Sequence, residues 1–350
     1  MSAAIAAARL ADPPMPSMFL STPGTRASLV SERLRVEVPP HNGTAEAVTR
    51  EIPLMEIEQL ILHDTVSLTI PALAELMRRD IPVVLTSAGE RVLGMCLPPA
   101  PHSTARIAQY RRSQDTAFAQ ALAINWVEAK ILNSRRVLQR LAANREDVEI
   151  TSHLLALNQL AQNCRSAASL ETLRGYEGTA AGRYFECYGG FFPEHAPFQR
   201  RSRRPPHNAA NAVLSYAYTL LGAEAEAHLH AIGLDPAIGF YHEPADRRAS
   251  LALDLIEPFR APLADAMALD LFTHGTLQPE AHFEPVNGGI YLAREGRSRF
   301  FVAYERRMQR EFTSEQHGHR TTLRREIHRQ CQAVKKAVID GEPFEPFLMN

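Results

Sequence analysis

Between Gly239 and Arg260, three side chains combine residue type and spacing suited to acid–base or metal chemistry: His242, Asp254 and Glu257. The histidine lies in a stretch punctuated by glycine and proline, and the acids follow on a predicted helix over 249–260, with a proline near its end. Residues three apart share a helix face. Two carboxylates among leucines repel each other, so they need a shared proton, an arginine or a metal cation. The histidine favours a cation such as Mg²⁺ or Mn²⁺.

The same residues also have simpler interpretations. An acidic pair three residues apart is typical of a solvated helix face, and a histidine in a loop is commonly exposed. A metal site at this point therefore needs a further ligand from elsewhere in the chain.

Glu177 is the candidate for that further ligand. It lies in a segment over 173–190 that is rich in small residues and tyrosines, and we expect it in the first turn of a helix. There it would either complement the helix dipole, a contribution of about 0.3–1 kcal/mol, or serve as a remote ligand.

Basic residues gather in a proline-bounded loop just before the predicted helix over 209–221. They are Arg200, Arg201, Arg203 and Arg204. Clustered guanidinium groups repel one another at low salt, and a polyanion relieves that repulsion. We therefore expect these four arginines to bind DNA backbone. The C-terminal region adds seven more arginines: Arg306, Arg307, Arg310, Arg320, Arg324, Arg325 and Arg329.

The composition sets few limits. The chain has 350 residues and a net charge of −1, from 38 basic and 39 acidic residues, so a nucleic-acid surface must be a local patch. The four cysteines are widely spaced, which excludes a zinc ribbon and a disulfide scaffold and favours reduced thiols in the cytoplasm. We find no P-loop, no Rossmann glycine motif, and no apolar run long enough for a transmembrane helix.

The elements that must position these residues divide the chain in two. Residues 1–17 are predicted to form a flexible leader. Residues 18–98 carry short β-like segments around one helix over 69–79, and a proline-rich linker follows. Residues 103–340 show helical periodicity, with predicted helices that include 151–163 and 301–338. The predicted class is α+β in two domains, with a small N-terminal β-rich domain and a larger, mainly α-helical catalytic domain.

Six motifs in order make the chain resemble a known family, the CRISPR-associated endonuclease/integrase of the spacer-acquisition machinery. The motifs are AKILNSRR at 129–136, YEGTAAGRYF at 176–185, RRPPHNAANAVLSYAYTLL at 203–221, IGFYHE at 238–243, RRASLALDLIEPFR at 247–260, and NGGIYL at 287–292 followed by YERRM at 304–308. The resemblance is spread across most of the chain, from about residue 18 to 340.

The resemblance implies a fold, a site and an activity. Its metal ligands fall here on Glu177, His242 and Glu257, with Asp254 as a supporting carboxylate of the catalytic set. They would hold Mg²⁺ or Mn²⁺. The implied enzyme inserts captured DNA into a CRISPR array by 3′-OH attack on a phosphodiester and also nicks DNA. The implied partners are double-stranded DNA, a second copy of the chain and the small second acquisition protein as a dimer.

Two other functions remain open at this stage. A non-catalytic DNA-binding scaffold would use the acids only to stabilise helices. A metal hydrolase acting on a small molecule would have an enclosed pocket and would leave the arginine clusters unexplained.

Overall fold

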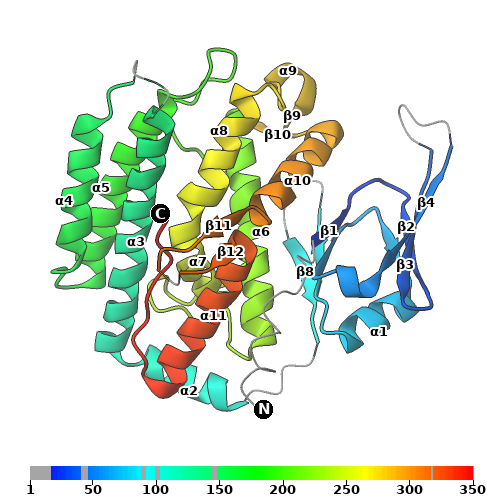
Figure 1. Ribbon diagram of the computed structural model, residues 1–350, viewed down its shortest axis with the longest axis horizontal. Coiled ribbons are helices and arrows are strands. Elements are labelled where there is room, and N and C mark those ends of the chain that lie inside the picture. The colour runs from blue at the N-terminus through cyan, green and yellow to red at the C-terminus, as the bar shows by residue number, and fades with distance from the viewer. Residues whose placement is uncertain are drawn as a thin grey trace. The chain divides into compact units, whose positions relative to one another are not determined.

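A computed structural model describes residues 17–40, 46–87, 92–98, 103–143, 145, 148–316 and 318–349. The leader predicted over 1–17 lies outside these residues except for Ser17, as does most of the predicted linker. The chain forms two compact units that meet in sequence near residue 98 (Figure 1). The first is β-rich and the second mainly α-helical, so the predicted fold class is confirmed.

The N-terminal unit contains two four-stranded sheets, with strand orders β1-β5-β7-β8 and β4-β3-β2-β6. Its strands are β1 (Ser17–Leu20), β2 (Arg26–Val30), β3 (Arg33–Val38), β4 (Val48–Pro53), β5 (Gln59–His63), β6 (Ser67–Leu68), β7 (Val83–Thr86) and β8 (Val92–Cys96). A short 3₁₀ turn spans Leu54–Glu56, and the helix is α1 (Ile70–Arg78), close to its predicted bounds. Leucines from strands and helix, among them Leu34, Leu60 and Leu76, are fully buried in one core.

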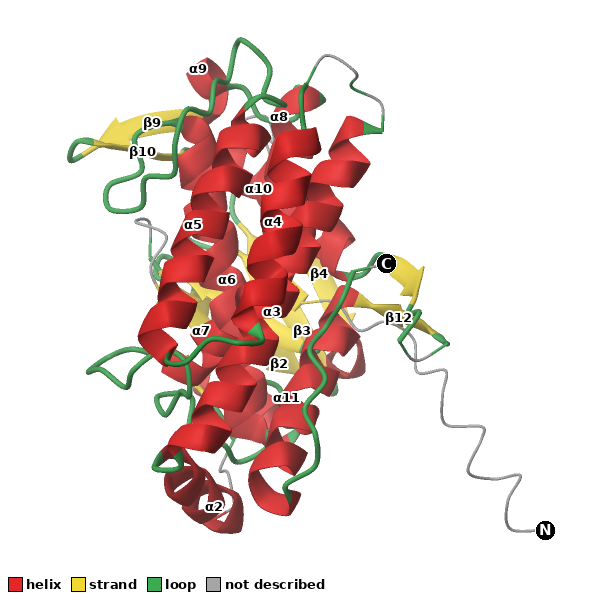
Figure 2. Ribbon diagram, turned by 90° about the vertical axis from the view of Figure 1, so that its left-hand side faces the viewer, coloured by secondary structure: helices red, strands yellow, loops and turns green. Residues whose placement is uncertain are grey.

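The C-terminal unit is built from helices and two small hairpins. The helices are α2 (Ser103–Ser113), α3 (Thr116–Ala142), α4 (Thr151–Cys164), α5 (Leu170–Gly189), α6 (Ala209–Ala231), α7 (Ser250–Ile256), α8 (Ala266–Thr273), α9 (Pro279–His282), α10 (Arg294–Met308) and α11 (Leu323–Asp340). The antiparallel hairpins pair β9 (Phe283–Val286) with β10 (Gly289–Leu292) and β11 (Glu311–Thr313) with β12 (Arg320–Thr322). Helices α3, α4 and α5 pack side by side (Figure 2).

Side-chain caps explain where the long helices begin. Asp115 accepts a hydrogen bond from the backbone of Phe118 at the start of α3, and Ser169 accepts one from Thr172 at the start of α5. Each cap satisfies an N–H group that has no partner within the helix. The buried faces of these helices, with Trp126 fully enclosed, hold α3 and α5 in place.

The predicted end of the helix over 249–260 is wrong. Helix α7 stops at Ile256, but the chain continues through a 3₁₀ turn (Glu257–Phe259) and a π-helical segment (Arg260–Asp265) directly into α8. Pro258 sits in the first turn of the 3₁₀ segment, where its missing N–H costs no hydrogen bond, so it reshapes the helix instead of ending it. Wide π turns of this kind are frequent at functional sites.

The single helix predicted over 301–338 is also wrong. Helix α10 ends at Met308, and the β11–β12 hairpin separates it from α11. Gly318, in the polar connection, has a positive φ of 68°, which a helix does not accommodate. Thr322 then caps α11 by accepting a hydrogen bond from the backbone of Arg325.

Candidate active site

Asp254 on α7 organises the loop that carries the candidate histidine. Its side chain is fully buried and accepts three backbone N–H groups, from Phe240 at 2.8 Å, Tyr241 at 3.0 Å and His242 at 2.8 Å. A Cβ atom at Gly239 would lie 2.9 Å from Asp254 Oδ2 and 2.6 Å from the carbonyl oxygen of His242, so the tight loop requires glycine there. Asp254 and Glu257 were predicted to share a helix face, and both carboxylates lie next to the His242 ring, Asp254 at Nδ1 and Glu257 at Nε2.

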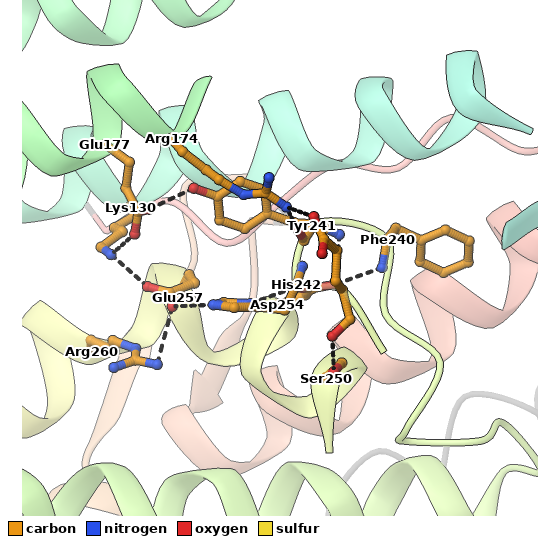
Figure 3. Close-up of polar contacts among 11 residues, drawn as sticks. Lys130, Arg174, Glu177, Phe240, Tyr241, His242, Ser250, Asp254, Glu257 and Arg260 are labelled. Atoms are coloured by element: carbon orange, nitrogen blue, oxygen red, sulfur yellow. Dashed lines mark hydrogen bonds and ion pairs between the residues drawn. The ribbon is translucent and has the colours of Figure 1, made fainter. Parts of the chain in front are cut away.

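Asp254 also sets the orientation of the His242 ring. Nδ1 of His242 lies 2.7 Å from Oδ1 of Asp254. A carboxylate only accepts hydrogen bonds, so Nδ1 is the donor. In the neutral ring, Nε2 then carries a lone pair. That atom faces Oε1 of Glu257 at 4.0 Å, as Figure 3 shows.

Glu257 is a buried carboxylate held between two cations. It begins the 3₁₀ turn after α7, is 3% exposed, and contacts Lys130 Nζ at 2.7 Å and Arg260 Nη2 at 3.1 Å. Burial alone would raise its pKa, but the charges of Arg260, Lys130 and His242 together lower the pKa of Glu257 to about 2. Glu257 is therefore ionised at neutral pH.

Glu177 reaches the same place from α5. Helix α5 begins at Leu170, so Glu177 lies two turns inside it and the predicted first-turn position is wrong. The helix dipole acts within the first turn, which removes the simpler interpretation of this residue. Tyr241 donates its hydroxyl hydrogen bond to Glu177 Oε2 at 2.5 Å, and burial raises the pKa of Tyr241, which keeps that proton in place.

Lys130 on α3 joins the two remote acids. Its ammonium pairs with Glu177 and with Glu257, and it lies between their side chains in Figure 3. Burial disfavours a charged ammonium, but the two carboxylates outweigh burial and raise the pKa of Lys130. Two of the predicted ligands, Glu177 and Glu257, thus share one cation, and the third, His242, lies beside Glu257.

The donor set is the kind that a hard divalent metal takes, although the described part of the chain holds no group of three His, Cys, Asp or Glu side chains arranged as a metal site. The Lys130 ammonium supplies the positive charge that a metal would otherwise supply. The carboxylates of Glu177 and Glu257 and the Nε2 lone pair of His242 are donors that suit a divalent metal ion, which would take the place of this ammonium.

A cavity of about 180 Å³ lies in the helical unit, and Lys130 and Glu177 of this cluster are part of its lining. Its lining includes cations, aromatic rings and small residues: Lys130, Ile131, Ser134, Leu157, Glu177, Gly178, Ala180, Ala181, Tyr184, Phe185, Arg201, Arg203, Tyr218, Arg260, Ala261 and Asp265. We call it the active-site pocket. Its cations suit a phosphate group and its aromatic rings suit a nucleotide.

Two comparisons place the chain among known proteins. The family described as CRISPR associated protein Cas1 matches residues 18–306, which is most of the chain. The chain belongs to the Cas1 family. A CRISPR-associated exonuclease Cas4/endonuclease Cas1 fusion from Rhodospirillum rubrum is 36% identical over 96% of this Cas1-family chain, which spans only 58% of that relative's length.

Solved structures agree with this fold. A casposase bound to integration product superposes with a TM-score of 0.84 at 22% identity, over 95% of this chain and 93% of that one. A chain of a Cas6-RT-Cas1–Cas2 complex gives a TM-score of 0.78 at 25% identity, over 97% of this chain and 37% of that chain. No helix in the described parts of the Cas1-family chain is both long and apolar enough to cross a membrane.

The four arginines of the predicted DNA-binding loop differ in their surroundings. Arg200, Arg203 and Arg204 are exposed. Arg201 is partly buried, donates to Asn211 and Ser215 at 2.9 and 3.0 Å, and lies over the Tyr218 ring. Arg201 therefore holds the loop against α6, while the other three are available to a ligand.

Sequence reasoning gave no role to several residues of this Cas1-family site. Lys130 lies within the AKILNSRR motif and Tyr241 within IGFYHE, but nothing in their spacing indicates that both contact Glu177. Arg260 and Asp265 were missed because the π-helical segment that carries them was not predicted.

Proposed function

We propose that this chain is a metal-dependent DNA endonuclease and integrase that inserts captured DNA into a CRISPR array, using a DNA 3′-OH to attack a phosphodiester, and that it can also nick DNA. The observation that carries the proposal is the convergence of Glu177 and Glu257 on Lys130, with His242 Nε2 4.0 Å from Glu257. Membership of the Cas1 family supports the choice of reaction.

Glu177, His242 and Glu257 would hold the metal ion, with Mg²⁺ and Mn²⁺ as the proposed ions. Cas1 nucleases generally depend on a metal ion. When bound, such a cation neutralises charge on the phosphate and lowers the pKa of a hydroxyl. We propose that Asp254 orients His242 so that Nε2, and not Nδ1, is the atom turned toward the metal.

Other residues would position the metal ligands or bind the DNA. Tyr241 positions Glu177 through its hydroxyl, and Arg174 steadies Tyr241 from above its ring and through its carbonyl oxygen. Arg203 and Arg260 line the active-site pocket and would bind phosphate oxygens there. We propose that Arg200 and Arg204 bind backbone outside the pocket.

The proposed partners follow from the family. A Cas1 chain similar to this one stands in a complex with Cas2, so we propose a Cas2-like small protein, as a dimer, as partner. We further propose double-stranded DNA as substrate, a homodimer of this chain, and a cytoplasmic location, which suits its unpaired cysteines.

One observation favours a second candidate, a non-catalytic DNA-binding scaffold. The Lys130 ammonium already balances the charge of both acids, so the cluster could stabilise the helices without any metal. In that case divalent cations would add nothing to DNA binding and no strand would be cut or joined.

A strand-transfer assay tests the proposal and separates the candidates. A duplex with free 3′-OH ends is incubated with a supercoiled repeat plasmid and the partner protein, in EDTA, Mg²⁺ or Mn²⁺. We expect products only with metal, and a loss of more than about a hundredfold in Glu177→Gln and Glu257→Gln. Glu171→Gln, an exposed acid on the same helix as Glu177, is the matched control. Full activity of Glu257→Gln in Mn²⁺ would refute the proposed site.

A further inference from the structure

A second cavity, of about 220 Å³, lies in the same helical unit and shares no lining residue with the active-site pocket. Its lining combines arginines with apolar side chains: Arg140, Pro262, Arg307, Arg310, Glu311, Phe312, Leu323, Phe347 and Met349. We call it the arginine cavity. The C-terminal tail, drawn in red in Figure 1, forms one wall and is fixed to α3 by hydrogen bonds from Asn133 to Phe347 and from Met349 to Asn133.

The lining is dominated by positive charge. Arg140 comes from α3, Arg307 from the end of α10, and Arg310 from the connection to β11. Glu311, the one acid among the described lining residues, is paired with Arg320, and the charge of Glu315 acts on Arg140. Burial lowers the pKa of Arg307, and the like charges of Arg310 and Arg140 lower it further. Asp270 on α8, 4.0 Å away, acts in the opposite direction and raises that pKa. An anion would relieve this repulsion.

The geometry of Arg307 makes the cavity a built feature rather than a random surface cluster. Its side chain is 15% exposed, and Nε and Nη2 donate to the carbonyl oxygen of Pro262 at 3.2 and 2.5 Å. This arginine is therefore fixed in orientation before any ligand arrives, which lowers the entropy lost on binding.

The remaining wall is apolar and lies beside the arginines. Phe312, Leu323 and Met349 form it, and Phe347 is buried behind them, stacked on Phe259 and edge to face with Phe312. A nucleotide combines a charged phosphate with a flat ring, and aromatic side chains bind bases without regard to sequence.

We propose that the arginine cavity is a second nucleic-acid site, which binds the phosphate and adjoining nucleoside of a single DNA strand away from the catalytic residues. The choice of DNA rests on the proposed function, whereas the preference for a phosphate rests on the three arginines alone. Pro262 belongs to the Arg260–Asp265 segment, and Arg260, Ala261 and Asp265 of the same segment line the active-site pocket, so this one segment contributes to both cavities.

The test is calorimetric titration of the full chain with 5′-phosphorylated dithymidylate in EDTA. We expect Arg140→Gln/Arg310→Gln to weaken binding about tenfold or more, since two charged donors are lost. Arg306→Gln, an exposed arginine on α10 that does not line the cavity, removes a charge from the same region and should bind like the wild type. Equal affinities of the double variant and the wild type overturn the proposal.

Further arms separate the possible sources of the signal. Inorganic phosphate should bind more weakly than the dinucleotide, and equal binding would overturn the assignment to a nucleic-acid strand. Arg203→Gln, which changes the active-site pocket, should still bind the dinucleotide. If this variant does not bind the dinucleotide at all, the dinucleotide occupies the active-site pocket and the proposal is wrong. Glu257→Gln should bind the dinucleotide normally while losing strand transfer, so failure of this site and failure of the proposed reaction give different results.

Discussion

Nδ1 of His242 lies 2.7 Å from Oδ1 of Asp254, and the same carboxylate accepts three backbone N–H groups of the loop that carries the histidine. One buried side chain therefore fixes both the path of the loop and the tautomer of the ring. Asp254 acts on the site through His242, in the manner of the partners that commonly orient metal-ligating histidines.

The first prediction concerns this relationship. Asp254→Asn leaves one oxygen acceptor and turns an NH₂ group toward donors, so we expect a loss of about 2–3 kcal/mol in the free energy of unfolding. Affinity for Mn²⁺ should fall roughly 10–100-fold because His242 is no longer held. Chemical denaturation and calorimetric titration measure the two effects. Asp246→Asn, an exposed acid of the same loop, is the control, and an unchanged Mn²⁺ affinity in Asp254→Asn would contradict the assigned role.

The second prediction concerns the ammonium of Lys130. Lys130→Gln leaves Glu177 and Glu257 without their shared cation, so in EDTA we expect about 3–5 kcal/mol of destabilisation. Mn²⁺ should restore much of the lost stability. It should also bind the variant more tightly than the wild type, because in the variant the metal ion does not compete with the ammonium. Thermal unfolding with and without Mn²⁺ tests this, with Lys336→Gln as an exposed control. If Mn²⁺ stabilises the variant no more than the wild type, Lys130 does not stand where a cation binds.

The local part of the site could be predicted from the sequence, because His242 and Asp254 belong to one loop and the helix that follows it. Glu177 was a candidate from its own segment, the family resemblance then placed it in the ligand set, and its helix begins earlier than predicted. Lys130 could not be assigned from the sequence, since one lysine on a long helix is normally a solvated side chain. Only the packing of α3 against α5 brings it to Glu177.

The fold shows the same division between local and long-range information. Helix α4 was predicted almost to the residue because its apolar periodicity is uninterrupted. The π-helical segment after Pro258 was missed, since proline normally marks a helix end and only its neighbours in the core decide otherwise. Arg260 and Asp265 owe their place in the active-site pocket to that segment.

The third prediction is a pH dependence from Asp265. Burial raises the pKa of Asp265 from its usual 3.8 to about 6, although Tyr218 donates a hydrogen bond at 2.5 Å to Oδ1. A folded carboxyl with a raised pKa stays protonated while the unfolded one ionises. The contribution of this carboxyl to the free energy of unfolding is therefore complete below pH 3.8. It decreases by about 3 kcal/mol as the pH rises to 6.

Asp265→Asn should remove this loss, because the amide oxygen still accepts from Tyr218 and carries no charge. The free energy of unfolding of the variant, relative to the wild type, should rise between pH 4 and pH 6.5 and then stay level. Denaturation curves at several pH values measure the difference. Parallel pH profiles for the two proteins would show that Asp265 ionises normally in the fold.

The fourth prediction separates the arginines of one loop by their contacts. Neutralising Arg200, Arg203 and Arg204 together removes exposed charges, so affinity should fall on every duplex sequence and the slope of log K against log salt should become shallower by about 3. Arg201→Gln should instead lower stability by about 1–3 kcal/mol, because Asn211 and Ser215 lose a charged donor. Binding isotherms between low and moderate salt, together with denaturation curves, measure both effects. If Arg201→Gln changed the salt slope as much as the triple variant does, Arg201 would leave its contacts with α6 and bind DNA, which would contradict its assigned structural role.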